Sequence, residues 1–527
     1  MLWRFFAVAI FLFTGIVEHG DGARILGVFP IPSISHQVVF RGLAKALNKR
    51  GHELVVITTD PVRDPALKNY TEIDLHVLYE GFKIFDHVML RGAINWEDNL
   101  PLMHALFSQQ TETILSHPEV KRLYSPGSGE KFDLVLIELL LSGALLPLAK
   151  RFDAPIIGIT SMGLTLPTQY SLGIPILSLH PSSWELDNRD SSSYSLWPRL
   201  SNFIRMWKYI HFHRTTWIPD NERIAKKYFG NDVPSIAEME KNISLIFVNQ
   251  QVPLSFTKPT VPGVIPIGGF HISKKLEPLP ESLRKILDEA TQGFIYMSLG
   301  TNVKSFMLTD EMRAEFVAAF SQLPFKVLWK FDDDEFPNKP DNVIIMKWFP
   351  QQAILAHPNL KVFVYQGGLQ STEEAISNGV PLIGLPVIGD QDMQVKKMVQ
   401  LGVAKMIEIK TLKREELLEA IRTVTTDGSY KENMLNLKSL ISDRPNDPLE
   451  NAIWWTEHVI RHRGTPYLRS STADDPWYQK NDMDIVAFIT ATFTTVLFVT
   501  LIVLYKCIIY MNGSSTRRSL DEAKKRN

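Results

Sequence analysis

Short apolar runs alternate along this chain with longer segments whose apolar positions recur at helical spacing. The runs cover residues 23–29, 53–59, 132–138, 155–160 and 243–249 in the first half, and 293–300, 326–331, 342–348, 361–365 and 381–386 in the second. Strands that alternate with helical segments of about 10–15 residues are typical of parallel sheets. The pattern therefore predicts an α/β protein with two Rossmann-like domains.

Both ends of the chain carry a further apolar segment. Near the N-terminus, Arg4 precedes the run FFAVAIFLF, and small residues follow up to Gly22, which is typical of a cleaved signal peptide. Near the C-terminus, the residues from Ile485 to Tyr505 carry no charge. As a helix they would cross about 30 Å of hydrocarbon, whereas a buried core helix is rarely apolar on every face. We therefore expect a single transmembrane helix.

Charge and proline content complete the predicted organisation. The tail beyond Tyr505 is rich in Lys and Arg, which favours a cytosolic tail and a lumenal body. A Pro-rich passage, VPLSFTKPTVPGVIP, separates the two halves and is the expected linker. The predicted parts are a signal peptide (1–22), an N-terminal domain (23–250), a linker (251–265), a C-terminal domain (266–434), a helical segment (435–470), a transmembrane helix (485–505) and a basic tail (506–527).

Composition limits the possible functions. Apolar residues make up 45% of the chain and charged residues 21%, as in folded globular proteins. The formal net charge is −1, so no large basic field argues for nucleic acid as a partner. The single cysteine, Cys507, excludes an intrachain disulfide. Two sequons, at Asn69 and Asn242, lie in the expected lumenal part and are candidate glycosylation sites.

The segment 348–391, WFPQQAILAHPNLKVFVYQGGLQSTEEAISNGVPLIGLPVIGDQ, carries the clearest chemistry. An apolar strand stops at a Gly-Gly turn and a helix begins at once, so backbone N–H groups converge where an anion can approach. Glu374, one turn into that helix, is placed to accept hydrogen bonds from ribose hydroxyls. Trp348 offers an aromatic face to a base, and Asp390 and Gln391 offer polar groups to a sugar. These features together indicate a nucleotide-sugar site.

This segment resembles the signature of the UDP-glycosyltransferase family, in its membrane-bound animal form. The family pattern runs from Trp-x-Pro-Gln through His/Gln-x-Gly, Ser, an acid and Gly-Val-Pro to a closing Asp-Gln. The matching residues are Trp348, Pro350, Gln351, Gln366, Gly368, Ser371, Glu374, Gly379, Pro381, Asp390 and Gln391. The resemblance extends over almost the whole chain. It implies the GT-B fold, with the acceptor in the first domain, the donor in the second, and residues 435–470 returning to the first.

The resemblance also implies roles for individual donor residues. Trp348 would stack on uracil, Gln351 would face the base or ribose, and Glu374 would bind the ribose. Gln366 and the N–H groups of the Gly368–Ser371 stretch would hold the diphosphate. Lys258 stands where many animal members have Arg. The full set of expected donor residues is Lys258, Ser298, Thr301, Trp348, Gln351, Gln366, Gly368, Gln370, Ser371, Glu374, Asp390 and Gln391.

The expected catalytic residues lie in the first domain. His36 follows the first strand, at the position of the family's catalytic His, and a neutral imidazole suits proton abstraction. The family's partner carboxylate is an Asp, and Glu138 stands in its place. No cofactor or metal is expected, because a helix N-terminus and polar side chains can neutralise the diphosphate. The expected reaction is inverting hexose transfer from a UDP-sugar to a small lipophilic acceptor hydroxyl.

Three alternatives stay open at this point. QGG and LQSTEEAI resemble insect members, which mostly use UDP-glucose, but a glucuronosyltransferase is the second enzymatic possibility. A non-catalytic, lumenal UDP-sugar-binding protein is the third, and only the Glu138 substitution favours it.

The terminal KKRN resembles a retrieval signal for the endoplasmic reticulum, where the protein would be a single-pass membrane protein and a possible homo-oligomer. The aromatic, basic stretch 194–217 either lines the acceptor pocket and touches the membrane or forms an ordinary buried helix.

Overall fold

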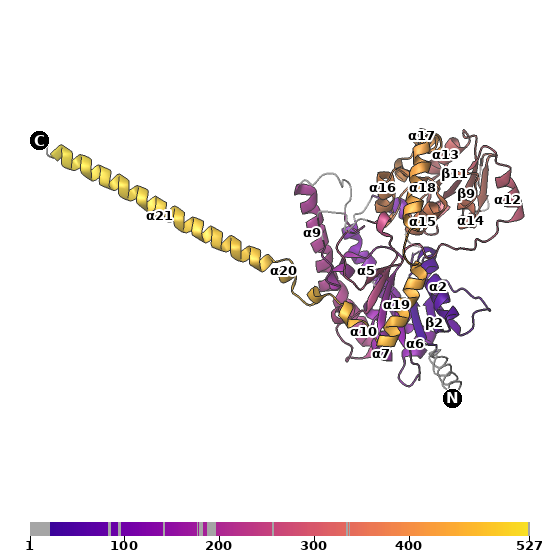
Figure 1. The fold of residues 1–527 in the computed structure, drawn as a ribbon, viewed down its shortest axis with the longest axis horizontal. Helices are drawn as coiled ribbons and strands as arrows, with labels where there is room; N and C mark the ends of the chain where they lie inside the picture. The colour runs from indigo at the N-terminus through magenta and orange to yellow at the C-terminus, as the bar shows by residue number, and fades with distance from the viewer. Residues whose placement is uncertain are drawn as a thin grey trace, which may run out of the picture. The chain divides into compact units, whose positions relative to one another are not determined.

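The structure of the protein is a computed structural model (Figure 1). It describes residues 22–82, 86–92, 96–140, 143–176, 178, 183–186, 196–255, 258–333, 336 and 338–524. The predicted signal peptide, apart from Gly22, and the last three residues of the basic tail lie outside the described residues. Residues up to Ser470 form one compact unit, and residues from Ser471 form a second unit, which is described separately.

The first domain is built on a seven-stranded parallel sheet of order β3-β2-β1-β4-β5-β6-β7. Its strands are β1 (Arg24–Phe29), β2 (Glu53–Thr58), β3 (Tyr70–Asp74), β4 (Leu134–Glu138), β5 (Ile156–Thr160), β6 (Leu245–Val248) and β7 (Val264–Pro266). The edge strands β3 and β7 were not anticipated. Strand β7 falls within the passage expected to be the linker, so the first sheet extends further along the chain than the predicted boundary at residue 250.

Both faces of this sheet are covered by helices. Alternate side chains of β1 enter different cores: Leu26 and Val28 pack with helices on one face, and Ile25 and Phe29 pack on the other. This alternation is expected for a strand, because successive side chains point to opposite faces. In chain order, the helices of this part of the chain are α2 (Ile34–Lys49), α3 (Tyr79–Phe82), α4 (His87–Leu90), α5 (Trp96–Ser116), α6 (Pro118–Tyr124), α7 (Pro147–Phe152), α8 (Leu166–Ser171), α9 (Leu196–Phe212), α10 (Ile218–Phe229) and α11 (Ile236–Lys241); α4 packs on the second domain.

The second domain repeats the layered arrangement around a six-stranded parallel sheet of order β10-β9-β8-β11-β12-β13. Its strands are β8 (Phe294–Ser298), β9 (Lys326–Lys330), β10 (Val343–Met346), β11 (Leu360–Tyr365), β12 (Leu382–Gly384) and β13 (Ala404–Met406). Its helices are α12 (Glu281–Asp288), α13 (Asp310–Phe320), α14 (Gln351–Leu355), α15 (Leu369–Asn378), α16 (Gln391–Gln400) and α17 (Arg414–Thr426). The two-domain α/β fold predicted from the sequence is confirmed.

Two helices follow the second sheet. Helix α18 (Gly428–Ser442) packs on α15, and α19 (Pro448–His462) packs on α2 of the first domain. Asp447 caps α19 by accepting hydrogen bonds from the N–H groups of Leu449 (2.9 Å) and Glu450 (3.3 Å). The Ala452, Ile453 and Val459 side chains join the core of the first domain. The chain thus contacts its first domain again after completing the second, as Figure 1 shows for α19 beside α2 and β2.

The second unit contains α20 (Trp477–Lys480) and the long helix α21 (Met483–Lys524). The part from Met483 to Ser514 is long and apolar enough to cross a membrane and is not buried inside the protein. Among the described residues it is the one helix with these properties. It fits a single-pass membrane anchor and includes the predicted span of residues 485–505.

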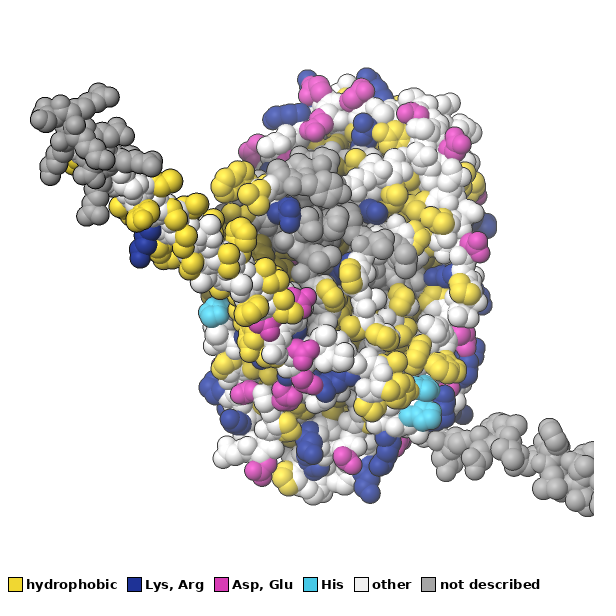
Figure 2. Space-filling model, turned by 60° about the vertical axis from the view of Figure 1, so that its left-hand side comes forward, with side chains coloured by type: hydrophobic (Ala, Val, Ile, Leu, Met, Phe, Trp, Pro, Cys, Tyr) yellow, Lys and Arg dark blue, Asp and Glu magenta, His cyan; other side chains and the backbone are white. Residues whose placement is uncertain are grey.

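Helix α9, within the stretch 194–217, matches neither expectation in full. Its second half is buried through Met206, Tyr209 and Ile210, whereas its first half exposes Trp197 and Ile204. Exposed apolar side chains occur at several separate places, among charged ones, on the face that Figure 2 turns toward the viewer. None of the α9 residues lines the large cavity described below. The stretch is therefore partly a core helix and partly an exposed apolar surface.

Candidate active site

A cavity of about 600 Å³ lies between the two domains of the first unit, at the carboxyl ends of both central sheets. Ligands of open parallel sheets bind at this edge. The lining residues from the first domain include Ile34, Ser35, His36, Val38, Met103, Phe107, Leu140, Ser161, Met162 and Trp184. Those from the second include Tyr296, Ser298, Thr301, Trp348, Gln351, Gln366, Gly368, Gln370, Ser371, Glu374, Asp390 and Gln391. The structure thus brings His36 and eleven of the twelve expected donor residues to one cavity.

His36 and Glu138 form a pair at the first-domain wall. His36 lies in the first turn of α2, and Glu138 is the last residue of β4. The His36 Nδ1 and Glu138 Oε1 atoms are 2.6 Å apart, and Glu138 Oε2 accepts a hydrogen bond from the Ile31 N–H at 3.3 Å. Burial raises the pKa of the Glu138 carboxyl, and the hydrogen bonds from His36 and Ile31 oppose that rise. The longer Glu side chain therefore reaches the imidazole.

A buried amide fixes the turn that presents His36. The Gln37 Nε2 group donates hydrogen bonds to the carbonyl oxygens of Phe29 (2.9 Å) and Ile31 (3.0 Å). The Gln37 Oε1 atom accepts from the Thr58 hydroxyl at 2.7 Å. Gln37 is almost fully buried, so every one of these bonds is costly to lose. No local sequence pattern marks Gln37, because its partners lie at or just after the ends of two strands, β1 and β2.

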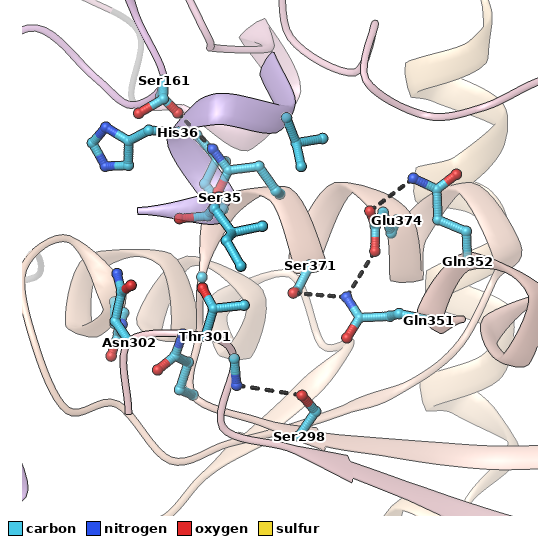
Figure 3. Close-up of a pocket in the computed structure, with 18 of the residues that line it drawn as sticks. Ser35, His36, Ser161, Ser298, Thr301, Asn302, Gln351, Gln352, Ser371 and Glu374 are labelled. Carbon is cyan, nitrogen blue, oxygen red and sulfur yellow. Dashed lines mark hydrogen bonds between the residues drawn. The ribbon is translucent and has the colours of Figure 1, made fainter. Parts of the chain in front are cut away.

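The opposite wall carries a hydrogen-bonded cluster around Glu374. Gln351 Nε2 donates to Glu374 Oε2 at 2.7 Å and to the Ser371 hydroxyl at 2.9 Å, and Gln352 Nε2 donates to Glu374 Oε1 at 2.9 Å (Figure 3). Trp348 is 55% exposed, so an aromatic face is accessible beside this cluster. The arrangement suits a base that stacks on Trp348 while its ribose meets a carboxylate.

The Gly-Gly turn between β11 and α15 and the loop after β8 approach each other closely. Gly367 has a φ of 96°, and a Cβ there would lie 2.5 Å from a Val395 methyl carbon. Gly300 has a φ of 79°, and a Cβ there would lie 2.2 Å from the Gln366 amide nitrogen. Both positions therefore require glycine. The α15 N-terminus at Gly368 has no side-chain cap in the described structure, and the buried Gln366 Oε1 has no hydrogen-bond partner there.

Asp390 and Gln391 lie where α16 begins. Gln391 Oε1 accepts hydrogen bonds from the N–H groups of Val387 (2.8 Å) and Ile388 (2.9 Å), which fixes its amide at the cavity edge. Burial raises the pKa of Asp390 to about 6, while the Gln394 amide and the His36 ring oppose the rise. Asp390 and His36 line the same cavity, Asp390 from the second domain and His36 from the first.

Two expected donor residues have other contacts. The Lys258 ammonium donates to Gln169 Oε1 at 3.0 Å, and Lys258 does not line the cavity. Burial lowers its pKa to about 8, and Glu185 opposes that shift. Gln370 lines the cavity, but its amide donates to the Ser161 carbonyl at 2.8 Å and so connects the two domains. Lys258 therefore lies outside the cavity that the other expected donor residues line.

A second carboxylate on α15, for which the sequence predicted no role, connects the domains. The buried Glu373 Oε1 accepts from Gln251 Nε2 at 2.5 Å, and Glu373 Oε2 lies 3.6 Å from His271 Nδ1. His271 Nε2 lies 3.8 Å from Glu374 Oε1. The chain between β7 and β8 thus contacts the same helix turn that presents Glu374 to the cavity.

Both sequon asparagines, Asn69 and Asn242, are exposed. The Asn242 amide donates to the Glu238 carbonyl at 2.9 Å.

In the part of the chain that the structure describes, no group of three or more His, Cys, Asp or Glu residues is arranged to hold a metal ion.

The two-sheet body is similar to solved glycosyltransferase structures. One is the glycotransferase of kitacinnamycin, with a TM-score of 0.56, 17% sequence identity, and coverage of 83% of this chain and 99% of that chain. At this identity the likeness concerns the fold. The fold is therefore the GT-B fold of glycosyltransferases, with the cavity in the cleft between the two domains.

Sequence comparison identifies the family. Residues 121–518 match the family of UDP-glucoronosyl and UDP-glucosyl transferases. UDP-glucosyltransferase 2 of Dactylopius coccus is 34% identical over 520 residues, which cover 96% of this chain and 97% of that protein. UDP-glucuronosyltransferase 2B14 of Oryctolagus cuniculus is 30% identical over 474 residues, covering 84% and 86%. The chain belongs to this family, and it is a UDP-glycosyltransferase.

Proposed function

We propose that the protein transfers a hexose, preferably glucose, from UDP to a small lipophilic hydroxyl compound with inversion at the anomeric carbon. The observation that supports this most directly is the position of the His36–Glu138 pair opposite the Trp348–Glu374 wall of one cavity. An acceptor held beside the imidazole would lie next to the sugar of a donor held by the second domain. A positioned base and a positioned leaving group are what a single displacement needs.

In this mechanism His36 Nε2 takes the acceptor's hydroxyl proton while the acceptor oxygen attacks the anomeric carbon. The bond from that carbon to the diphosphate oxygen breaks on the opposite face, and UDP leaves with the electron pair. Glu138, as a carboxylate, accepts the Nδ1–H hydrogen bond, which fixes the tautomer and stabilises the imidazolium that forms. The product is a β-glycoside when the donor sugar is α-linked.

The second domain would bind the donor in three places. Trp348 stacks on the uracil and Glu374 accepts from the ribose hydroxyls. The Gln366 amide and the N–H groups at the start of α15 hold the diphosphate. The Asp390 carboxylate accepts hydrogen bonds from hydroxyl groups of the sugar, and the Gln391 amide nitrogen donates a hydrogen bond to it. The turn residue Gln366 is neutral, so the partial charge of the helix N-terminus would carry most of the stabilisation of departing UDP.

The reaction as proposed needs no metal ion, because the α15 N-terminus and polar side chains meet the diphosphate directly. EDTA is therefore expected to leave turnover unchanged. A strict requirement for a divalent cation would contradict this part of the proposal.

Glucose is preferred as the donor sugar because of the QGG turn, and a UDP-glucosyltransferase is among the similar proteins. UDP-glucuronate is the second candidate, since a protein named as a UDP-glucuronosyltransferase is 30% identical. The contact between Glu138 and His36 removes the sequence feature that favoured a non-catalytic binding protein. The acceptor end of the cavity is lined by apolar side chains, including Met103, Phe107 and Leu140, which suits a lipophilic acceptor.

We further propose that the body is lumenal in the endoplasmic reticulum, with α21 as the anchor and the basic tail in the cytosol. The uncharged span followed by Lys and Arg supports this orientation. The exposed Asn69 and Asn242 side chains would then carry glycans.

A donor panel tests the proposed function. The full chain, purified in detergent, is incubated with UDP-glucose, UDP-glucuronate or UDP-galactose and several phenols, and products are separated by mass. Glucose transfer is expected to be fastest and to be lost in His36→Gln. Faster transfer from UDP-glucuronate would favour the second candidate, and UDP binding without transfer from any donor would overturn the enzymatic proposal.

A further inference from the structure

A short segment of the first domain lies on the second domain, away from the linker. In this segment Asp86 caps the four-residue helix α4 by accepting from the Met89 N–H at 2.9 Å. Val88 is buried, and it packs in the hydrophobic core of the second domain with residues such as Ile409. The Lys410 ammonium donates to the carbonyl oxygens of Met89 (3.2 Å) and Arg91 (3.1 Å). Residues 86–92 therefore belong to the second domain by their contacts.

Arg91, at the end of α4, binds two carboxylates of the second domain. Its Nε and Nη2 atoms donate to the Glu408 carboxylate, with the shortest distance 2.7 Å. Its Nη1 atom donates to Asp392 Oδ2 at 2.9 Å and Nη2 donates to Asp392 Oδ1 at 3.1 Å. The Arg91 side chain is only 10% exposed. Bidentate, partly buried guanidinium–carboxylate pairs of this kind are among the stronger and more directional polar contacts.

One of the two carboxylates, Asp392, belongs to a helix that begins at the cavity. Asp392 lies in the first turn of α16, directly after Asp390 and Gln391, which line the cavity. Glu408 follows β13 and accepts from the Lys410 N–H at 3.2 Å at the start of the next helical turn. The start of α16 also lies close to the Gly-Gly turn between β11 and α15. A Cβ added to Gly367 would be only 3.0 Å from the Gln391 carbonyl oxygen. A shift of the α16 start would therefore move both polar residues at the sugar end of the cavity.

We propose that Arg91 is a positioning residue for the donor sugar: by joining Asp392 to Glu408, it holds the start of α16 so that Asp390 and Gln391 face the sugar. This rests on the proposed placement of the sugar at those two residues. Arg91 also balances the negative charge of Asp392 and Glu408, which would otherwise stand next to a donor that is itself an anion. The contact comes from the first domain, so it forms only when the two domains are together.

The residues proposed to bind the nucleotide are separate from the Arg91 cluster. Trp348, Gln351 and Glu374, which face the nucleotide, have no contact with the Arg91 cluster among those described. Loss of Arg91 is therefore expected to weaken binding of the complete UDP-sugar much more than binding of UDP, which would meet the start of α16 only through the neighbouring Gly367 turn. A role in overall folding alone would lower both affinities together.

The test compares Arg91→Lys and Arg91→Met with a matched control in the full-length protein. Arg63→Met is the control, because the Arg63–Asp74 ion pair (2.7 Å) is exposed and lies within the first domain. Affinities for UDP and for UDP-glucose are measured by titration without acceptor, so the result does not depend on transfer activity. Melting temperatures show which variants are folded. If Arg91→Met does not fold, Arg91→Lys, which keeps the positive charge, serves as the test variant.

We expect UDP-glucose affinity to fall about tenfold or more in Arg91→Met, which corresponds to about 1.4 kcal/mol, and to fall less in Arg91→Lys. UDP affinity should stay within about threefold of the wild type, and Arg63→Met should change neither. Adding Asp392→Asn and Glu408→Gln to Arg91→Met should restore part of the lost affinity, because the unpaired carboxylates are removed. Equal losses for UDP and UDP-glucose, or unchanged UDP-glucose affinity in folded Arg91 variants, would overturn the proposal.

Discussion

Shortening the carboxylate that faces His36 is a sharp test of the proposed catalytic pair. Glu138→Asp keeps the charge but withdraws the carboxyl group by one methylene, about 1.5 Å. The Glu138 Oε1 atom now lies 2.6 Å from His36 Nδ1, so the withdrawn group would be beyond hydrogen-bond reach unless the backbone moved. Glu138→Gln keeps the length but removes the charge. The first change tests geometry and the second tests charge.

The expected losses follow from the strength of the contact. A hydrogen bond to a charged group is worth about 1.5–3 kcal/mol, so losing it should lower kcat about 10- to 150-fold. Glu138→Asp and Glu138→Gln should both fall in this range. His36→Gln removes the base itself and should cost about 10² to 10⁴. Asp133→Asn, just before the same strand, is the matched control and should retain nearly full activity, because Asp133 contacts the backbone of Arg24 instead.

The assay is glucose transfer to a phenol at saturating donor, with UDP affinity measured in parallel. All three variants of the His36–Glu138 pair should bind UDP as the wild type does, because the pair lies in the first domain. If Glu138→Asp were as active as the wild type, the carboxylate would not act through the contact that the structure shows. If His36→Gln were as active as the wild type, the proposed mechanism would be wrong.

Three further predictions concern the donor site, stability and topology. Trp348→Ala should weaken UDP binding by about 1–3 kcal/mol in a titration. The control is Trp197→Ala, which should not weaken UDP binding, because Trp197 is exposed and lies outside the cavity. Equal affinities for wild type and Trp348→Ala would place uracil elsewhere. Burial raises the pKa of Glu185 to about 8, above the ordinary 4.5, so the folded state keeps a proton that the unfolded state loses. Stability should therefore fall by up to about 1.4 kcal/mol per pH unit as pH rises through this window, and Glu185→Gln should flatten the slope of melting temperature against pH; an unchanged slope would contradict this. Protease added to sealed microsomes should remove only the tail beyond about Lys506, and digestion of the body would refute the lumenal orientation.

The fold could be predicted because buried parallel strands appear in a sequence as apolar runs. The strands that were missed lack this signal. Strand β3, YTEID, is a largely polar edge strand, and β7 and β13 are three residues each. Their pairing depends on a neighbouring strand already in place. The expected linker therefore began too early, since β7 pairs with β6 and completes the first sheet.

The donor site could be predicted in part because its residues follow one another along a single strand–turn–helix–strand segment. Side-chain direction was harder to predict. Gln370 follows the glycine turn but extends to the Ser161 carbonyl of the other domain, and Lys258 pairs with Gln169. Both outcomes depend on contacts between distant parts of the chain.

The same limit explains the residues that sequence reasoning missed. The Arg91 side chain meets Asp392, 301 positions later in the chain, and Glu373 meets Gln251 across 122 positions. No local pattern marks either pair, because a lone Arg or a second Glu on a helix is ordinary. Only the packing of the two domains gives these residues their partners.

The anomeric configuration of the product tests the central claim most directly. The purified protein would be given UDP-glucose, in which the sugar is α-linked, with a phenol acceptor, and the glucoside would be examined by NMR before any rearrangement. A base on one wall and a leaving UDP on the other predict a β-glucoside formed in one displacement, and His36→Gln should slow its formation by about 10² to 10⁴. An α-glucoside would contradict the single displacement that this cavity is proposed to support.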